Sequence, residues 1–381
     1  MNRPATNASR KKLCVAVVFG GRSGEHEVSL LSARAVLSAL DRERFDVLPV
    51  GISLDGRWLV GGDPLAYLEA LARGEQPPEA PSPVPPADVV AELVASPEPT
   101  TPYGEALRRV DVAFPVLHGP YGEDGTIQGL FEMVGWPYVG CGVAASAVAM
   151  DKELSKAVFK SAGLPVVPYV VVMRREWEET PQAVAERVEA HLSYPLFVKP
   201  ANLGSSVGVT KVHGPEELSD AINLAATFDR KVIVEQGVEG ARELEVSVLG
   251  NDEPRASVVG EVRPSQDHEF YDYEAKYTEG GSELLIPAPV PEKVQRAVRE
   301  LAVAAFKAID GSGMARVDFL MDPTTGTIYV NEVNTIPGFT PFSMYPRLWE
   351  AEGLTYPRLV EALIELALER AADRARNRIA R

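Results

Sequence analysis

The chain has 381 residues, too many for one simple core, and its length predicts two or three domains. Its 45% hydrophobic and 24% charged residues are typical of a globular protein and favour neither a disordered nor a fibrous class. A net charge of -16 argues against a nucleic-acid partner, because such binding needs clustered Lys and Arg. No apolar run is long enough to span a membrane, so we expect no membrane partner and a cytoplasmic location.

The N-terminal part of the chain predicts an α/β unit. The apolar run 13–19 predicts a strand, and the glycine-rich loop 20–24 leads into a helix with Val28, Leu31 and Ala35 on one side. In open α/β sheets, ligands bind at such a loop, where a parallel strand ends. The glycine spacing is not that of a dinucleotide-binding motif.

Two more strands are predicted in this unit, at 45–52 and 110–117. The second ends at His118, which either contacts a ligand or makes structural hydrogen bonds. Between them, residues 76–102 are rich in Pro, Ala, Glu and Ser, which predicts a surface excursion with at most a short helix around 89–94. No function is assigned to this segment.

The next unit has two lysines at positions where they could bind an anion. Asp151 is a suitable N-cap for a helix that begins with Lys152, and a strand at 195–200 carries Lys199 near its end. The small, glycine-bounded loop 201–209 follows, and its backbone amides can form an anion-binding concavity beside Lys199. A plain hairpin turn with a solvated lysine fits this pattern equally well. The pattern G-x-x-x-x-G-K-[ST] is absent, which disfavours a Walker-type NTPase.

Further along, strands are predicted at 231–236 and 242–250, the second with an acidic face. Residues 271–277 hold three tyrosines and a lysine and are followed by glycines, which favours a mobile lid over a small polar ligand. A helix that packs its tyrosines on its neighbours is the alternative. Residues 356–368 predict a closing helix, and 370–381 predict a basic, frayed tail.

Residues 313–335 predict a β-hairpin with a central cluster of turn residues. Arg316 and Asp318 share one face of the first strand, and Glu332 and Asn334 share one face of the second. Carboxylate and amide oxygens suit Mg²⁺ that is shared with substrate phosphates, and the arginine suits an anion. From this pattern alone, a surface hairpin with ordinary polar residues is the alternative interpretation.

Taken together, these features describe an ATP site without a P-loop, and the chain resembles the D-alanine:D-alanine ligases of the ATP-grasp superfamily from about residue 13 to 368. Five motifs carry the resemblance in family order: GGRSGEHEVS (20–29), HGPYGEDG (118–125), KPANLGSSVG (199–208), YDYEAKY (271–277) and NEVNTIPG (331–338). Each motif is modest evidence, whereas the ordered set is highly specific.

The resemblance implies an α/β, three-domain ATP-grasp fold with an N-terminal doubly wound domain. The expected domains are 1–140 with the first D-alanine site, 141–235 as the central ATP-grasp domain, and 236–381 with the metal site and the lid. The implied reaction is ATP-dependent ligation of two D-alanines through D-alanyl phosphate, for peptidoglycan precursor synthesis. The implied cofactors are ATP and two Mg²⁺ or Mn²⁺ ions, and the implied assembly is a homodimer.

The resemblance also implies roles for individual residues. Catalytic roles fall to Glu25, Ser205, Tyr277, Arg316 and Gly338, with Arg316 and the Gly338 amide stabilising an oxyanion. ATP contacts fall to Lys152, Lys199, Glu235, Val238, Glu243 and Lys276. Substrate contacts fall to Glu25, His118, Ser343 and Met344, and metal coordination to Asp318, Glu332 and Asn334. The pair Lys276 and Tyr277 favours an amine acceptor. A ligase for D-lactate or D-serine and a non-catalytic ATP sensor are the alternatives.

Overall fold

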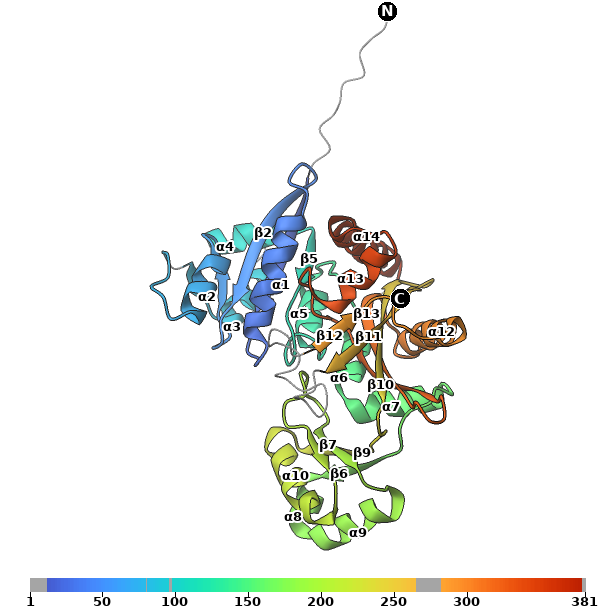
Figure 1. Ribbon diagram of the computed structural model, residues 1–381. Coiled ribbons are helices and arrows are strands. Elements are labelled where there is room, and N and C mark those ends of the chain that lie inside the picture. Colours follow the sequence, from blue (N-terminus) through green and yellow to red (C-terminus); the bar gives the residue numbers. More distant parts are fainter. Residues whose placement is uncertain (1–11, 80, 96–97, 265–281, 379–381) are drawn as a thin grey trace, which may run out of the picture.

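The computed structural model describes residues 12–79, 81–95, 98–264 and 282–378 (Figure 1). They form three β-sheets with helices packed on them, the mixed α/β architecture expected from the sequence. In Figure 1 the second sheet and its helices form a separate lower lobe. Among the described helices, none combines the length and apolarity that a membrane crossing needs.

The first sheet has the order β4-β3-β2-β1-β5, and β1 lies parallel to both β2 and β5. Its strands are β1 (Leu13–Gly20), β2 (Phe45–Ile52), β3 (Trp58–Val60), β4 (Ser82–Val84) and β5 (Val112–Pro115). Its surrounding helices are α1 (His26–Ala39), α2 (Pro64–Ala72), α3 (Pro86–Val90), η1 (Ala91–Ala95), α4 (Pro102–Arg108) and α5 (Thr126–Val134). Residues of β1 are buried in cores on both faces, which explains its unbroken apolar run.

The apolar side expected for helix α1, which carries Val28, Leu31 and Ala35, is not its buried side. Leu31 is 57% exposed, whereas Ser29, Leu30 and Ala33 are buried. The hydroxyl of Ser29 donates to the carbonyl of Val116 at 2.6 Å, so this polar residue is satisfied inside the fold. Hydrophobic periodicity cannot rank such a residue as buried, and it therefore selected the wrong side.

The segment 76–102 holds more regular structure than the single short helix expected. Strand β4 pairs with β3 at the edge of the first sheet, and α3 and η1 follow. Proline is tolerated on an edge strand because one side of that strand needs no ladder hydrogen bonds, and Pro83 lies in this strand.

The second sheet is antiparallel, with the order β6-β9-β7-β8. Its strands are β6 (Tyr169–Met173), β7 (Leu196–Pro200), β8 (Thr210–Val212) and β9 (Lys231–Gln236), and its helices are α8 (Arg174–Glu179), α9 (Pro181–His191) and α10 (Pro215–Phe228). Alternate strand residues enter one core with α9 and α10. The strands predicted at 195–200 and 231–236 are thereby confirmed.

The third sheet is also antiparallel, with the order β12-β11-β10-β13-β14. Its strands are β10 (Arg242–Gly250), β11 (Arg255–Pro264), β12 (Ser282–Leu285), β13 (Gly313–Met321) and β14 (Ile328–Asn334). The helices α6 (Val143–Met150), α7 (Lys152–Ser161) and α12 (Glu292–Ala308) share a core with it. Helices α6 and α7 therefore pack on the third sheet although they precede the second in the sequence. The predicted hairpin β13–β14 and the Asp151 N-cap of α7 are confirmed.

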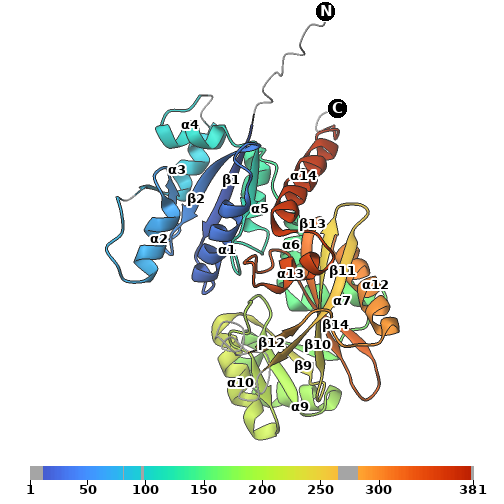
Figure 2. The same cartoon turned by 45° about the horizontal axis from the view of Figure 1, so that its top comes forward.

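The last two helices join the first and third sheets. Helix α13 (Met344–Ala351) packs on β10 and β11, and α14 (Tyr356–Arg374) contacts α1, β5 and β13 (Figure 2). The frayed tail expected from residue 370 is wrong for its first five residues. Arg370 donates to the carbonyl of Tyr138 at 2.9 Å and to the hydroxyl of Ser312 at 2.6 Å, and these distant partners extend the helix.

Candidate active site

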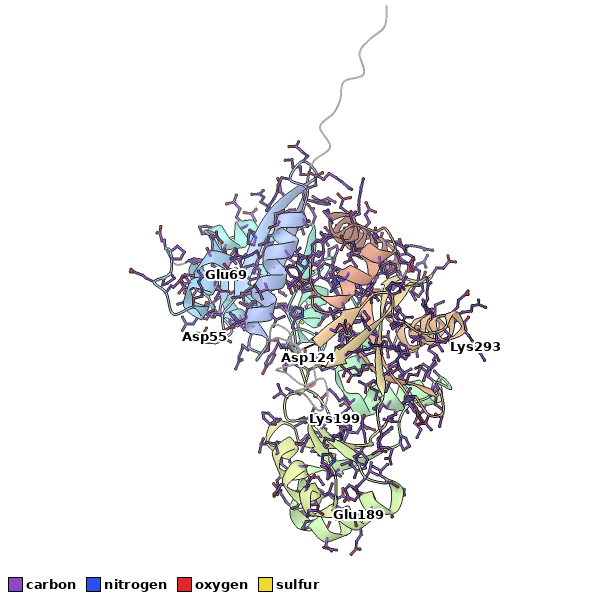
Figure 3. All side chains as sticks on the ribbon, viewed as in Figure 1. Asp55, Glu69, Asp124, Glu189, Lys199 and Lys293 are labelled. Carbon is purple, nitrogen blue, oxygen red and sulfur yellow. The ribbon has the colours of Figure 1, made fainter. Side chains whose placement is uncertain are left out.

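A cavity of about 580 Å³ lies between the second and third sheets. Figure 3 shows Lys199 at the end of the lower lobe that faces the rest of the molecule. The cavity is lined by Lys152, Lys199 and loop residues 203–206 on one side, by residues 235–241 and 243–245 at the connection between the sheets, and by Arg316, Asp318, Asn331 and Glu332 of the hairpin. These residues come from four stretches of sequence that are far apart, and the fold brings them together.

The two predicted phosphate lysines both lie in the cavity wall. Lys152 donates to the carbonyl of Leu203 at 2.5 Å, in the glycine-bounded loop. Lys199 forms an ion pair of 2.6 Å with Glu235. Burial acts to lower the pKa of Lys199, but the Glu235 carboxylate outweighs it and the pKa is raised. Lys199 is thus cationic, and both lysines face a space that suits an anionic ligand.

The hairpin presents its polar side chains to the same cavity. The guanidinium of Arg316 makes two hydrogen bonds of 2.7 Å to the carboxylate of Asp318. Asp318 lies opposite Glu332 across the two strands, and the Asn334 amide donates to Asp318 at 3.0 Å. The shared face predicted for these four residues is confirmed by their partly exposed positions between buried neighbours.

A β-bulge in β14 produces this arrangement. Asp318 pairs with Glu332 but Phe319 pairs with Val330, so Asn331 is an extra residue in the strand. The bulge allows Val330 and Val333 to be buried while Glu332 and Asn334 face the cavity side. Simple alternation would have placed Val330 and Glu332 on one face.

The donor set of the hairpin fits a hard divalent cation. Two carboxylates and an amide stand together, and rotation of the Asn334 amide would present its oxygen in place of its nitrogen. Within the described ranges, no cluster of three His, Cys, Asp or Glu side chains has the arrangement of a metal site. Mg²⁺ is commonly held by one or two carboxylates together with water and substrate phosphates.

A second group of side chains gathers where the first sheet meets the loop 201–209. The hydroxyl of Ser205 donates to the carboxylate of Glu25. A Cβ atom on Gly119 would stand 2.6 Å from Glu25 Oε2, and one on Gly204 would stand 3.2 Å away. Glycine at both positions therefore leaves room for the carboxylate, and Gly119 also has φ +73.

His118, which is buried, and Glu123, which is partly exposed, both lie within electrostatic reach of Glu25. The His118 ring contacts the hydroxyl of Ser32 and the carbonyl of Ile336, each at 3.0 Å, which matches the structural alternative for this residue. Its direct contact with a substrate stays a prediction. Burial, followed by the nearby Glu25 carboxylate, raises the pKa of Glu123 to about 8. Arg316 acts electrostatically on both His118 and Glu123, so it connects this group with the cavity.

The predicted residues after the hairpin lie in the loop that leads into α13. Ser343 is the N-terminal cap residue of this helix, and its hydroxyl accepts from the Thr340 amide at 3.1 Å. A Cβ atom on Gly338 would stand 3.1 Å from that hydroxyl, and Met344 is buried. Gly338, Ser343 and the start of α13 thus form one local surface.

Of the predicted ATP contacts, Val238 and Glu243 line the cavity together with Glu235. Lys276 and Tyr277 of the expected lid lie outside the described residues. Lys156, Glu245 and Glu123 also belong to the site or its surroundings but were not predicted. Lys156 stands one helical turn after Lys152, Glu245 faces the same way as Glu243, and Glu123 belongs to a quoted motif, so each had a usable signal.

Family models cover most of the chain. The model described as the D-ala D-ala ligase N-terminus matches residues 14–141, and that described as the D-ala D-ala ligase C-terminus matches residues 158–365. The D-alanine–D-alanine ligase of Heliobacterium modesticaldum is 51% identical over 373 residues, which is 96% of this chain and 97% of the relative. That of Deinococcus radiodurans is 52% identical over 93% of this chain and 98% of the relative.

Solved structures agree with this assignment. The D-Ala:D-Ser ligase of Enterococcus faecalis superimposes with a TM-score of 0.80 at 38% identity, over 94% of this chain and 100% of that one. The D-alanine–D-alanine ligase of Coxiella burnetii gives 0.76 at 33% identity, over 96% and 97%. The chain therefore belongs to the D-alanine–D-alanine ligase family of ATP-dependent ligases and has the ATP-grasp fold of that family.

Proposed function

We propose that this enzyme joins two D-alanine molecules into D-alanyl-D-alanine, with release of ADP and phosphate, for peptidoglycan precursor synthesis. The supporting observation is the position of Arg316, which faces the lysine-lined cavity and acts electrostatically on the group around Glu25. This guanidinium would thus be available both to phosphoryl transfer in the cavity and to the attack on an activated carboxylate beside the cavity. That arrangement suits a ligase better than an ATP sensor, which needs no second substrate site.

A carboxylate is a poor electrophile, so the first step transfers the γ-phosphoryl group of ATP to one D-alanine. Lys152 and Lys199 hold phosphate oxygens, while Glu235, Val238 and Glu243 contact adenine and ribose. Glu25 pairs with the ammonium of the first D-alanine, and its hydrogen bond from Ser205 fixes the carboxylate in place. The amine of the second D-alanine then attacks the acyl phosphate, and phosphate leaves.

The oxyanion that forms in this attack needs donors. Arg316 and the amide of Gly338 fill that role, and preorganised donors of this kind are usually the largest contribution in acyl transfer. Ser343 and the backbone of Met344 receive the carboxylate of the second D-alanine at the start of α13, where helix amides favour an anion. Two Mg²⁺ or Mn²⁺ ions held by Asp318, Glu332 and Asn334 would neutralise phosphate charge.

The test is phosphate release from ATP and Mg²⁺ with D-alanine, L-alanine, or D-alanine plus a competing acceptor, with products resolved by mass. We expect release that requires D-alanine and yields D-alanyl-D-alanine. D-serine belongs in the panel because one similar structure is that of a D-Ala:D-Ser ligase, and D-lactate tests a hydroxyl acceptor. A preference for either acceptor would assign the chain to a sister activity of the same family.

Gly119→Ala is expected to raise KM for D-alanine about tenfold or more. The new methyl would stand 2.6 Å from Glu25 Oε2, at a backbone φ of +73 that disfavours a side chain. Affinity for ATP should stay unchanged, because Gly119 does not line the cavity. Steady-state kinetics with each substrate varied in turn measures both effects.

Gly135→Ala is the matched control. Gly135 has φ +72, but no atom lies within 4 Å of its added methyl. Both variants therefore strain the backbone in the same way, but only Gly119→Ala brings a methyl close to Glu25. An equal rise of KM for D-alanine in both variants would show that strain, rather than Glu25, is responsible.

The homodimer rests on the family resemblance alone. Sedimentation equilibrium of the full chain would test it, with a mass of twice 41.2 kDa as the expected result.

A further inference from the structure

A buried lysine stands behind the cavity wall. Lys156 lies on α7 one turn after Lys152, but its side chain is only 1% exposed and does not line the cavity. Its ammonium is 2.9 Å from Glu235 Oε1, while that of Lys199 is 2.6 Å from Glu235 Oε2. Each oxygen of this carboxylate therefore has its own cation.

Lys156 also reaches the opposite wall. Its Nζ lies 3.5 Å from the carbonyl oxygen of Asn331, the extra residue of the bulge that precedes Glu332. Glu235 is the last residue but one of strand β9 in the second sheet, and Asn331 belongs to the third sheet. A single ammonium thus contacts both sheets at the base of the cavity.

Lys156, Glu235 and Lys199 form a charged triad, and its charges explain why two lysines are present. Glu235 is 2% exposed, and a buried carboxylate without a counter-ion is strongly destabilised. Burial acts to raise the pKa of Glu235, but Lys156 and Lys199 together lower it to about 2, so the side chain is an anion at neutral pH. Lys199, 15% exposed, lines the cavity, and the acidic groups Glu243 and Glu332 also act on it. Only Lys199 can therefore exchange its carboxylate partner for a ligand.

We propose that Lys156 is a positioning residue that serves as the permanent counter-ion of Glu235 and thereby frees Lys199 to bind a phosphate of the nucleotide. Without Lys156, each contact of Lys199 with phosphate would leave Glu235 buried and unpaired. Lys199 would then stay with Glu235, and the nucleotide would lose a phosphate ligand. The assignment of Lys199 to phosphate belongs to the proposed function, on which this inference rests.

The first experiment replaces Lys156 with methionine, which keeps the length of the side chain and removes its charge. Calorimetric titration with ATP and with ADP should show affinity about tenfold weaker or more, because Lys199 is held back. KM for D-alanine should change less than about twofold, since the Glu25 group does not contact the triad. Unchanged affinity for both nucleotides would overturn the proposal.

Lys160→Met is the matched control. Lys160 lies one turn further along α7, is exposed, and stands over the ring of Tyr169 at 5.5 Å rather than beside Glu235. Nucleotide affinity should match that of the wild type in this variant. A loss equal to that of Lys156→Met would point to α7 as a whole and would contradict a specific role for Lys156.

A double variant separates this role from simple attraction between Lys156 and the phosphates. In a Glu235→Gln background no anion needs a counter-ion, so adding Lys156→Met should change ADP affinity less than about twofold. General attraction predicts the same loss in both backgrounds, and that outcome would overturn the proposal. The comparison also holds if Lys156→Met alone does not fold. Because ADP binding needs no ligation, failure of dipeptide synthesis would count against the proposed function and leave this test intact.

Discussion

Replacing Arg316 with alanine is expected to lower kcat for D-alanyl-D-alanine formation by about 10²–10³-fold, the usual loss when one oxyanion donor is removed. The guanidinium is held by two bonds to Asp318 and by Glu245 at 3.0 Å, so it is already oriented before substrates bind. Nucleotide affinity should change little, because Lys152 and Lys199 are untouched. Dipeptide assays and ADP titration together measure the two effects, and a parallel collapse of ADP affinity would show that Arg316 is misassigned.

Arg242→Ala provides the control for a lost arginine–carboxylate pair in the same sheet. Arg242 makes two hydrogen bonds to Glu261, at 2.8 and 2.7 Å, but does not line the cavity. Its replacement should leave kcat near the wild-type value. A comparable loss of kcat in Arg242→Ala would mean that Arg316→Ala acts by disturbing the third sheet and not by removing an oxyanion donor.

Replacing Glu332 with glutamine should lower activity at fixed Mg²⁺ on the order of 100-fold and raise the Mg²⁺ concentration needed for half-maximal rate. The substitution keeps the shape of the side chain but removes one of the two carboxylates that stand opposite each other on the hairpin. Titration of the initial rate with Mg²⁺ and with Mn²⁺ measures the shift. An unchanged metal requirement would remove Glu332 from the metal site.

Asp322→Asn controls for a change of charge in the same hairpin. Asp322 lies in the turn, where its carboxylate accepts from the amide of Thr324 at 2.7 Å and from the hydroxyl of Thr325 at 2.8 Å. Asp322 does not line the cavity, so the Mg²⁺ requirement should stay that of the wild type. If it shifts as in Glu332→Gln, the effect comes from the net charge of the hairpin.

Local patterns were the most predictable part of the fold. The hairpin β13–β14, the strand β1 and the N-cap of α7 each depend on residues that lie close together in sequence. Alternation, an apolar run and a capping side chain encode such elements directly. For the same reason, the two-residue spacing of Arg316 and Asp318 was enough to place them on one face of the strand.

Errors arose where a distant partner decides the outcome. Helix α1 buries Ser29 because the carbonyl of Val116, 87 residues away, accepts its hydroxyl. Helix α14 continues past residue 370 because Arg370 meets Tyr138 and Ser312. Strand β4 exists because the edge of β3 is available to pair with it. None of these distant partners can be recognised from the residue pattern of the segment that it contacts.

By itself, the sequence determined the family, through five motifs in a fixed order, and with it the residues to examine. The tertiary structure decided how those residues combine. It placed Arg316 in the cavity wall within electrostatic reach of Glu123, used a bulge to turn Glu332 toward the cavity, and put Lys156 beside Glu235. The physical reason is that a motif reports which side chains are present, whereas charge pairing and burial depend on which segments the fold brings within a few ångströms.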